Sequence, residues 1–375
     1  MSTNTKRKIQ FCTKCIMPST RPRQTFLEDG SCNACRWAEE KKYFDWSERW
    51  AELEALCDKY RSRNKNHFDV IVPYSGGKDG AYIAWTLREK LGMTPLAVTV
   101  RPPMEDSIGE QNIKNFLDRG FDHIMVTPNR KVGAYIDKEN FINKGIPMHA
   151  HMIAVQTVIF RCAVQYQVPF VMFAEEGESE YGGSTKLQNQ HTYSLEESID
   201  IYLSGVNPRK YLDKFSEKDL YWYLYPSKED LIALNPEISH WSYFEDFNNY
   251  MHYVVAKEKC GLLERETRSV GSYENFSSTD TDIIFLYHYL MYLKFGFGRA
   301  LSIASTDIRR GALTRKQALN LVKKYDGEFP EPYIENYLKF YEMAREEFDT
   351  VLDKWANKDL FEKIDNRWVP TFELY

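Results

Sequence analysis

The sequence predicts an α/β protein built on a parallel sheet, with a four-cysteine metal module before the sheet and a mostly helical part after it. Three observations predict this class. Short apolar runs alternate with helix-like patterns from Asp69 to Ala174, as in parallel strands joined by right-handed crossovers. One run ends at a Ser-Gly-Gly turn that opens a helix, and two Cys-x-x-Cys pairs lie near the N-terminus. We expect a zinc module in residues 1–40, a linker helix in 41–66, the α/β domain in 67–190 and a mostly helical substrate or partner region in 191–375.

The two Cys-x-x-Cys pairs, Cys12 with Cys15 and Cys32 with Cys35, are separated by sixteen residues. This spacing is typical of a zinc site in which each pair brings two thiolates to one tetrahedral ion. Four thiolates leave no open position on the metal, so we expect a structural site that supplies folding energy to a segment with little core. A redox pair, or two chance pairs, is the alternative interpretation. The charged, helix-like pattern of residues 36–66 predicts a helix that links the module to the sheet.

Four apolar runs predict the strands of the sheet. In parallel sheets with crossovers, ligands bind at the carboxyl ends of the strands, near the point where the strand order reverses. We therefore expect the chemistry at these strand ends. The expected strands are 70–74, 96–100, 123–126 and 168–174, with a further short strand at 241–244, and the expected helices include 111–119, 152–167 and one that begins after Thr314.

The first strand ends in Ser75-Gly76-Gly77-Lys78-Asp79, a turn suited to capturing an anion. Its two glycines let the backbone approach a phosphate, its N–H groups point inward, and the following helix adds partial positive charge. Lys78 adds a full charge, and Asp79 can hold Mg²⁺ against the phosphates. The turn lacks the G-x-x-x-x-G-K-[ST] spacing of the usual phosphate loop. A glycine-rich turn without a ligand is the alternative.

The fourth strand ends in an acidic segment, 175–183, which contains four glutamates and three glycines. Crowded carboxylates repel one another unless a cation lies among them, and Mg²⁺ bound to pyrophosphate is the natural candidate. A solvated acidic loop is the alternative. The sequence does not reveal which carboxylate would bind the metal. The candidates for magnesium are Asp79, Glu175 and Glu178, and Glu176 is a candidate catalytic group.

Several other polar residues are candidates for binding substrate. Two histidines lie just before the long apolar helix, where a structural role is the alternative. Arginines next to glycine turns suit recognition of phosphate or carboxylate groups, although surface arginines at helix ends are also common. The candidate substrate residues are His149, His151, Tyr181, Arg299, Arg309 and Arg310.

The composition limits the class of function. The 375 residues suffice for two or more domains, and 43% hydrophobic and 27% charged residues are ordinary for a soluble globular protein. A net charge of −5 argues against broad nucleic-acid binding. No apolar run is long enough to span a membrane, and Met1 to Lys8 lacks the apolar core of a signal peptide. We expect a cytoplasmic protein whose cysteines are thiols or metal ligands rather than disulfides.

The loop after the first strand resembles the S-G-G-x-D loop of the PP-loop ATP pyrophosphatases, which share an adenine nucleotide α-hydrolase-like fold. The resemblance implies that ATP is split into AMP and pyrophosphate, with AMP activating a carbonyl or carboxyl oxygen. It implies Lys78 and Asp79 as catalytic residues, with ATP and Mg²⁺ as cofactors. Many members carry Ser after the Asp, where this chain has Gly80. The ATP-binding residues that it implies are Tyr74, Ser75, Gly76, Gly77, Lys78, Asp79, Thr99, Val100, Arg101 and Gly177.

Four features together resemble the N-acetyl sugar amidotransferases of bacterial surface-polysaccharide and lipopolysaccharide O-antigen biosynthesis, over nearly the whole chain. They are the cysteine module, the loop, the Glu-Tyr-Gly-Gly end of the acidic segment, and the segments 295–299 and 307–311. The resemblance implies that an acetamido group of a nucleotide sugar is adenylylated and then converted by ammonia into an acetamidino group. We find no convincing glutaminase arrangement, so the resemblance implies separate partners, similar to the glutaminase and cyclase-like subunits of histidine biosynthesis.

A PP-loop tRNA thiolation enzyme is the alternative function, because such enzymes also pair zinc modules with this loop. They usually need reactive cysteines near the active site and a basic face for RNA. The cysteines outside the module, Cys57, Cys162 and Cys260, form no Cys-x-x-Cys pair, and the net charge is negative. A zinc-dependent scaffold without catalysis is a third interpretation, against which Lys78, Asp79 and the acidic segment argue.

Overall fold

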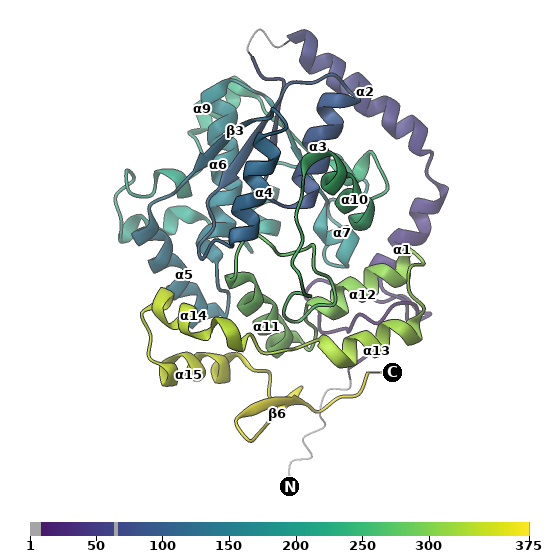
Figure 1. Cartoon of the computed structure of the whole chain (residues 1–375), viewed down its shortest axis with the longest axis vertical. Coiled ribbons are helices and arrows are strands. Elements are labelled where there is room, and N and C mark those ends of the chain that lie inside the picture. Colours follow the sequence, from purple (N-terminus) through teal and green to yellow (C-terminus); the bar gives the residue numbers. More distant parts are fainter. Residues whose placement is uncertain (1–8, 64–66, 375) are drawn as a thin grey trace.

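The computed structural model describes residues 9–63 and 67–374, and it confirms the predicted α/β class (Figure 1). The expectation for Met1 to Lys8 lies outside these residues, as does the end of the predicted linker helix. Five parallel strands form one sheet in the order β3-β2-β1-β4-β5. The strands are β1 (Val70–Pro73), β2 (Pro95–Val100), β3 (Asp122–Val126), β4 (Phe170–Phe173) and β5 (Glu237–His240).

The strand order reverses at β1, the central strand. The chain passes from β1 to β2 and β3 on one side, and then returns to the other side of β1 to form β4 and β5. The loop after β1 and the segment after β4 therefore leave neighbouring strands at the switch point, where parallel sheets bind ligands. This topology places the predicted phosphate loop next to the predicted acidic segment.

Helices cover both faces of the sheet, because side chains of β1 alternate between two hydrophobic clusters. Val70 and Val72 belong to the cluster under α2, α3, α4 and α10, and Ile71 belongs to the cluster under α5 and α6. Figure 1 shows α3 beside α10, with which it packs closely. These helices are α2 (Trp46–Arg63), α3 (Lys78–Glu89), α4 (Ser107–Leu117), α5 (Arg130–Lys144), α6 (His149–Tyr166) and α10 (Asn249–Cys260).

The fifth strand lies in the region predicted to be mostly helical. The strand predicted at 241–244 is wrong: β5 ends at His240, and Trp241–Tyr243 forms the 3-10 helix η5. Trp241 is fully buried, and its Nε1 donates to Glu245 Oε2 over 2.7 Å, so its ring turns into the core instead of extending the strand. The elements between β4 and β5 are α7 (Gly177–Tyr181), α8 (Leu195–Glu197), the π-helix η2 (Ser198–Tyr202), η3 (Pro208–Asp213), η4 (Tyr221–Tyr223) and α9 (Lys228–Leu234).

The cysteine module and the C-terminal helices form the lower part of the molecule in Figure 1. The module packs on α12 and α13 in one hydrophobic cluster, while α11, α14 and α15 pack around another. The chain ends in two helices followed by a β-hairpin. The elements are α1 (Asn33–Glu40), η1 (Lys41–Tyr43), α11 (Ile283–Phe295), α12 (Arg299–Arg309), α13 (Arg315–Tyr325), η6 (Glu331–Tyr333), α14 (Ile334–Tyr341), α15 (Arg345–Trp355), β6 (Phe361–Ile364) and β7 (Arg367–Pro370).

Within the described ranges, a search for a helix with the length and apolar character of a membrane span finds none.

Candidate active site

The loop after β1 is held by close backbone packing. Gly76 has φ +86°, and a Cβ there would lie 2.7 Å from the carbonyl oxygen of Gly109, so only glycine fits without a backbone shift. Gly80 is equally constrained, since its Cβ would lie 2.6 Å from the carbonyl oxygen of Pro73. The helix α3 therefore starts directly against the end of β1. A side chain at position 80 would therefore require the backbone to shift.

Lys78 and Asp79 open α3 and contact each other. Lys78 Nζ lies 2.7 Å from Asp79 Oδ2, and Lys78 is 8% exposed, so its charge is largely removed from bulk water. Burial by itself would raise the pKa of Asp79, but Lys78 and His252 together hold it well below its usual value. Asp79 is therefore ionised, as a magnesium ligand must be.

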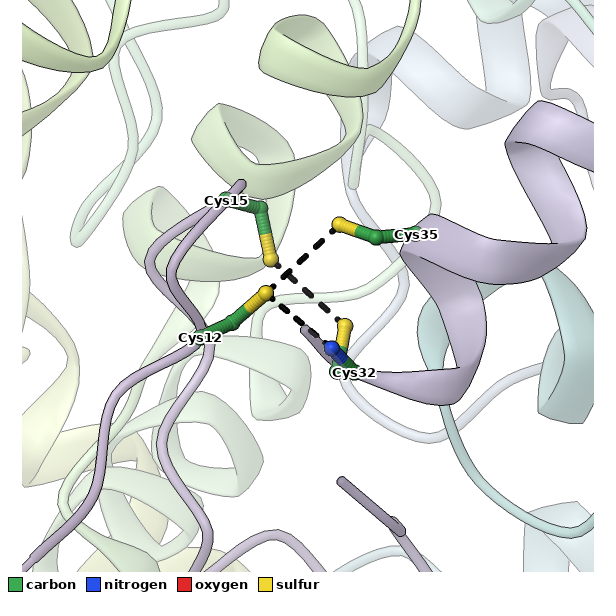
Figure 2. A group of neighbouring side chains, drawn as sticks. All are labelled: Cys12, Cys15, Cys32 and Cys35. Atoms are coloured by element: carbon green, nitrogen blue, oxygen red, sulfur yellow. Dashed lines mark hydrogen bonds between the residues drawn. The ribbon is translucent and has the colours of Figure 1, made fainter. Parts of the chain in front are cut away.

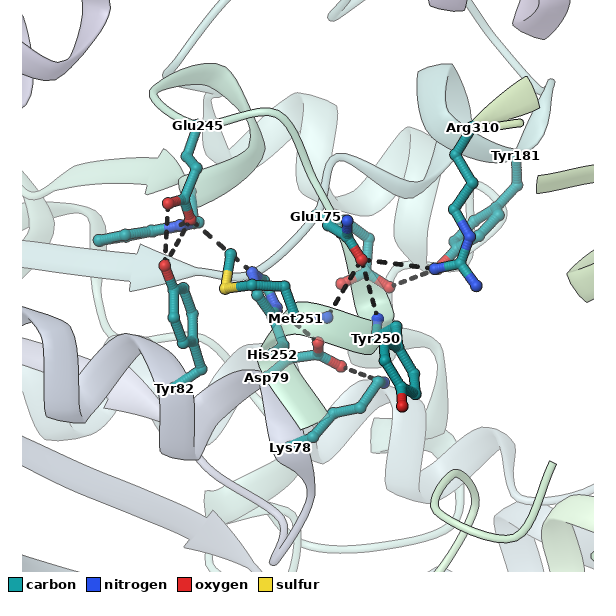
Figure 3. Close-up of polar contacts among 12 residues, drawn as sticks. Lys78, Asp79, Tyr82, Glu175, Tyr181, Glu245, Tyr250, Met251, His252 and Arg310 are labelled. Atoms are coloured by element: carbon teal, nitrogen blue, oxygen red, sulfur yellow. Dashed lines mark hydrogen bonds and ion pairs between the residues drawn. The ribbon is translucent and has the colours of Figure 1, made fainter. Parts of the chain in front are cut away.

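A histidine that the sequence analysis did not single out completes this side of the site (Figure 3). His252 Nδ1 lies 2.8 Å from Asp79 Oδ1, and its Nε2 lies 3.9 Å from Glu245 Oε2. Tyr82 stacks on the imidazole with ring centroids 4.1 Å apart and donates to Glu245. Although burial opposes it, the hydrogen bond with Asp79 and the nearby carboxylate of Glu245 raise the pKa of His252. His252 thus fixes the orientation of the Asp79 carboxylate.

Glu175 lies across the switch point from Asp79. Its Oε1 accepts a hydrogen bond of 3.2 Å from the hydroxyl of Tyr181. Burial, and then the negative charge of Asp79, raise the pKa of Glu175, while Lys78 opposes this shift. Two carboxylates that disfavour each other's ionisation in this way accommodate a divalent cation. Asp79 and Glu175 are the two magnesium candidates that the structure brings together.

The other glutamates of the acidic segment have different contacts. Glu176 caps α7, accepting from the backbone N–H groups of Glu178 and Ser179 over 3.1 and 2.8 Å. Glu178 instead accepts from Arg23 Nε over 2.9 Å and from Arg23 Nη2 over 2.5 Å, so its carboxylate is held by an arginine of the cysteine module. Gly177 is the first residue of α7. Through these contacts Glu176 and Glu178 hold α7 in place, and the contacts do not connect either residue to Asp79.

The predicted adenine-binding segment lies at the edge of a cavity. Thr99 itself is buried, and its hydroxyl donates to the carbonyl of Tyr74, whose ring is also buried. Val100 and Arg101 follow at the end of β2 and line a cavity of about 470 Å³, here named the strand-end cavity. His151, from the first turn of α6, lines the same cavity, and burial lowers its pKa to about 4. A neutral imidazole therefore faces this space.

The two neighbouring histidines of α6 point to different spaces. His149 is 1% exposed and lines a second cavity of about 230 Å³, here named the module cavity because Arg21 and Arg23 of the cysteine module form part of its wall. Burial is the main reason why the pKa of His149 falls to about 4. The structure therefore does not bring His149 and His151 into one substrate site.

The three candidate arginines are also dispersed. Arg310 reaches the side chain of Asn248, which caps α10, over 3.4 Å, and pairs with Asp307 over 2.7 Å. Arg299, at the start of α12, lies close enough to Tyr181 to lower its pKa against the effect of burial. Arg309 points to the metal module and is described below.

The four predicted zinc ligands form one cluster (Figure 2). All four are buried, and their sulfur atoms lie within 4.8 Å of one another, with 3.7 Å between Cys12 and Cys35 and between Cys15 and Cys32. Four sulfurs about 2.3 Å from one tetrahedral zinc ion lie about 3.8 Å apart, so the cluster fits such an ion. Hydrogen bonds from the other three thiols, Cys12 foremost, hold the pKa of Cys15 well below its usual value.

Arg309 connects this cluster to α7. Its Nη2 donates to the carbonyl of Glu180 over 2.8 Å, and the charges of Cys15, Cys35 and Cys32 raise its pKa against the effect of burial. The side chain of Glu180 in turn accepts from Lys41 Nζ over 3.0 Å and from Trp37 Nε1 over 3.2 Å, both next to the module. The structure thus places Arg309 between the metal ligands and α7.

Sequence reasoning missed His252, Glu245, Tyr82 and Asp280. Tyr82 is one helical turn from Asp79, so its position on that face of α3 could have been noticed. His252 and Glu245 reach the site only because α10 packs on α3, which no local pattern reports. Asp280 is half-buried and lies beside Ser75 of the loop, although it comes from a segment about 200 residues further along the chain, and desolvation raises its pKa.

The remaining cysteines are unsuited to redox or sulfur chemistry. Cys57, Cys162 and Cys260 are all buried, and burial raises the pKa of each to about 12. A reactive cysteine needs thiolate character near neutral pH. These three residues instead fill core positions.

Comparison with known proteins gives one family match. Residues 270–374 match the family model described as "LPS biosynthesis protein WbpG-like, C-terminal domain". No curated protein matches the chain significantly. The matched segment includes Asp280, Arg299 and both arginines of the 307–311 segment.

Solved structures that match the chain include two synthetases and a thiolase. NH3-dependent NAD synthetase from Campylobacter jejuni is 14% identical, with 51% of this chain and 93% of that chain covered and a TM-score of 0.29. NMN synthetase from Francisella tularensis is 12% identical, with coverage of 80% and 98% and a TM-score of 0.32. U34-tRNA thiolase NcsA from Methanococcus maripaludis, solved with its [4Fe-4S] cluster, is 17% identical, with coverage of 85% and 89% and a TM-score of 0.33. The family match confirms, over residues 270–374, the predicted similarity to proteins of lipopolysaccharide biosynthesis.

Proposed function

We propose that the protein is an ATP-dependent amidotransferase of lipopolysaccharide biosynthesis that converts an acetamido group of a nucleotide sugar into an acetamidino group. The observation that carries this proposal is the arrangement at the switch point. Lys78 and Asp79 open α3 directly after the glycine loop, and the carboxylate of Glu175 faces them from the end of β4. The family match of residues 270–374 supports the pathway. Ammonia would come from separate glutaminase and cyclase-like subunits in the cytoplasm.

The reaction proceeds in two displacements. The amide oxygen of the acetamido group attacks the α-phosphorus of ATP, and pyrophosphate leaves. Ammonia then adds to the activated carbon, AMP leaves with that oxygen, and loss of a proton gives the amidine. An amide is a poor electrophile, so converting its oxygen into the leaving group AMP lowers the barrier.

The described residues supply charge where this reaction needs it. The loop N–H groups, the start of α3 and Lys78 neutralise the leaving pyrophosphate. Asp79 and Glu175 offer carboxylate oxygens to Mg²⁺, which would stabilise the charge on the phosphates. The buried cysteine cluster fits a structural Zn²⁺, since four thiolates leave no open position on the ion. The strand-end cavity, lined by Val100 and Arg101, is the space available for the adenosine part of ATP.

Pyrophosphate release tests the proposal. The purified protein receives ATP, Mg²⁺ and an ammonium salt, together with either UDP-linked diacetamido sugars or bulk tRNA. We expect release that depends on one of the sugars, and a product about one mass unit lighter, because NH replaces O. Release that depends on tRNA would instead support the thiolation alternative, which the buried, high-pKa cysteines disfavour. If neither the sugars nor tRNA caused pyrophosphate release, even after addition of the glutaminase subunits, the amidotransferase proposal would be overturned.

A pair of lysine variants makes the assay specific for the site. Lys78→Met should reduce kcat by about 100-fold or more, since it removes a charge that stabilises the leaving group. Lys42→Met is the matched control, because Lys42 is exposed and pairs only with Glu39 on the same helical segment among the described residues. Equal activity of the two variants would argue that the loop is not the ATP site.

A further inference from the structure

The module cavity lies where four segments that are distant in sequence meet. Its wall combines Arg21 and Arg23 from the cysteine module, His149 from α6, Glu178 from α7 and Lys294 from α11. The strand-end cavity uses other residues of the same first turn of α6. The two cavities are therefore separate spaces on either side of that turn, and the module cavity is not accounted for by ATP binding at the strand ends.

The polar lining of the module cavity carries more positive than negative charge. Glu178 is already paired with Arg23, at 2.5 Å. Among the described residues, neither Arg21 nor Lys294 forms an ion pair with a carboxylate, although the charge of Glu178 acts on Arg21. Lys294 donates to the carbonyls of Lys144 and Gly145, over 2.8 and 3.4 Å. Burial lowers the pKa of Lys294 to about 8, so it is still mostly protonated at neutral pH. An anion is the ligand that this lining favours.

Buried polar atoms in the wall are left without partners. The Nε of Arg21 is buried with no hydrogen-bond partner in the described part of the chain, and neither ring nitrogen of the fully buried His149 has one. Burying a donor without a partner is unfavourable, so these atoms favour a ligand that carries acceptor atoms. Oxygen atoms of a phosphate would accept from Arg21 and from whichever nitrogen of His149 carries the proton.

Aromatic and thioether side chains form the rest of the wall. The guanidinium of Arg21 lies over the ring of Phe297, with its Cζ 5.4 Å from the ring centroid, and this contact helps to hold the arginine side chain in place. Tyr287, Phe295 and Met291 complete this apolar part. A cavity of about 230 Å³ with a charged and an apolar side suits a diphosphate and the group attached to it rather than a lone phosphate ion.

We propose that the module cavity binds the diphosphate of the nucleotide-sugar substrate, with Arg21 and Lys294 as its cationic ligands and His149 as a hydrogen-bonding partner. The identity of the ligand rests on the proposed function. The placement agrees with it, since α7 separates the two sites: Glu178 lines the cavity, and Glu175 and Tyr181 face the phosphate loop. One helical turn advances about 5.4 Å. The attached sugar would then extend along α7 from the cavity to the loop.

Direct binding of UDP tests the site without ATP or catalysis. Isothermal titration calorimetry compares the wild type with Arg21→Met, Arg21→Lys, Lys294→Met and the control Arg209→Met, whose arginine is 58% exposed on the surface. We expect Arg21→Met and Lys294→Met each to weaken UDP binding at least about tenfold, since each removes a charge-assisted contact. Arg21→Lys should recover part of the loss, and Arg209→Met should match the wild type. Circular dichroism and thermal unfolding identify a variant that fails to fold.

The kinetic constants separate the failure of this site from failure of the proposed function. The cavity proposal predicts that Arg21→Met and Lys294→Met raise KM for the nucleotide sugar and leave KM for ATP unchanged. The cavity proposal would be overturned if only KM for ATP increased, or if both folded variants bound UDP as tightly as the wild type. Sugar-dependent pyrophosphate release would then still support the proposed function. Conversely, UDP binding that depends on Arg21, with no acetamidino product from any sugar, would uphold the cavity and overturn the function.

Discussion

The two sides of α7 differ sharply although they are only a few residues apart. On one side, Glu175 and Tyr181 face the phosphate loop, and the nearest charges are Lys78 and Asp79. On the other side, Glu178 is paired with Arg23 of the cysteine module, and Glu180 is paired with Lys41 of η1, which directly follows the module. A single acidic segment thus carries both a carboxylate that we assign to the proposed magnesium site and carboxylates that hold α7 in place. We infer that the cysteine module supports α7 on the side away from the loop after β1.

Removal of the metal from the cysteine module should have the largest effect on stability and activity, because the module holds α7. Structural zinc contributes on the order of 10 kcal/mol to the folding of small modules. We expect chelation, or Cys15→Ser, to lower the melting temperature strongly and to abolish activity, because the unfolded module would no longer hold its own Arg23, or the adjacent Arg309, against α7. The control Cys162→Ala changes a core cysteine outside the cluster. A metal-free protein with full activity would show that α7 does not depend on the module.

Metal analysis sharpens the same prediction. The sulfur spacing of 3.7 Å matches a single tetrahedral ion. We expect one zinc ion per chain, and neither labile sulfide nor the visible absorption of an iron–sulfur cluster. Stoichiometric iron and sulfide would assign the module to the cluster-binding type instead.

Glu180→Gln tests the buried contact between α7 and η1. Lys41 and Glu180 are 8% and 10% exposed, and breaking a buried pair leaves an uncompensated charge at a cost of about 3–5 kcal/mol. We expect the free energy of unfolding, measured with urea, to fall by about 3 kcal/mol. The loss lies at the lower end of the range because Lys41 remains paired with Asp246 at 2.8 Å. The matched change Glu178→Gln should cost under about 1 kcal/mol, since its partner Arg23 is 43% exposed. Equal losses in the two variants would contradict the distinction between them.

Glu175→Gln tests the carboxylate just before α7 that faces Lys78 and Asp79. The substitution keeps the shape and removes the charge that we assign to the magnesium site. We expect kcat for pyrophosphate release to fall about 100-fold, with the melting temperature unchanged or slightly raised because a buried carboxylate is removed. Wild-type kcat in this variant would remove Glu175 from the proposed metal site.

The protonation of His252 should give the smallest effect. Asp79 and Glu245 raise its folded-state pKa, so the charged imidazole stabilises the protein below its unfolded pKa of about 6.5. This contribution is lost as the pH rises through the raised pKa of the folded state. We expect His252→Gln to lower stability by about 1 kcal/mol at pH 5.5, with a gap to wild type that narrows as the pH rises. A gap that widens with pH would mean that the histidine is neutral in the fold.

The parts of the molecule that are local in sequence were predictable, and those assembled across the chain were not. Cys-x-x-Cys spacing and the Ser-Gly-Gly turn each place their ligands within one turn of backbone, so the cysteine cluster and the parallel sheet are confirmed. Aromatic residues such as Trp241 favour strands, which fits the strand predicted at 241–244. The structure instead forms a 3-10 helix there, which turns the buried Trp241 ring into the core. His252 and Asp280 join the site only through tertiary packing, which a single sequence does not encode locally.

The contact between Gly76 and Gly109 has a consequence for how the chain can be divided. A Cβ on Gly109 would lie 2.9 Å from the Cα of Asp280, so backbone from the matched C-terminal segment rests on α4, and α4 rests on the phosphate loop. Three peptide segments touch with no side chain between them. A chimera that exchanges the C-terminal part for that of another protein must reproduce this backbone trace, and a shortened chain that ends before residue 270 would lack the backbone that supports α4 and, through α4, the proposed ATP-binding loop.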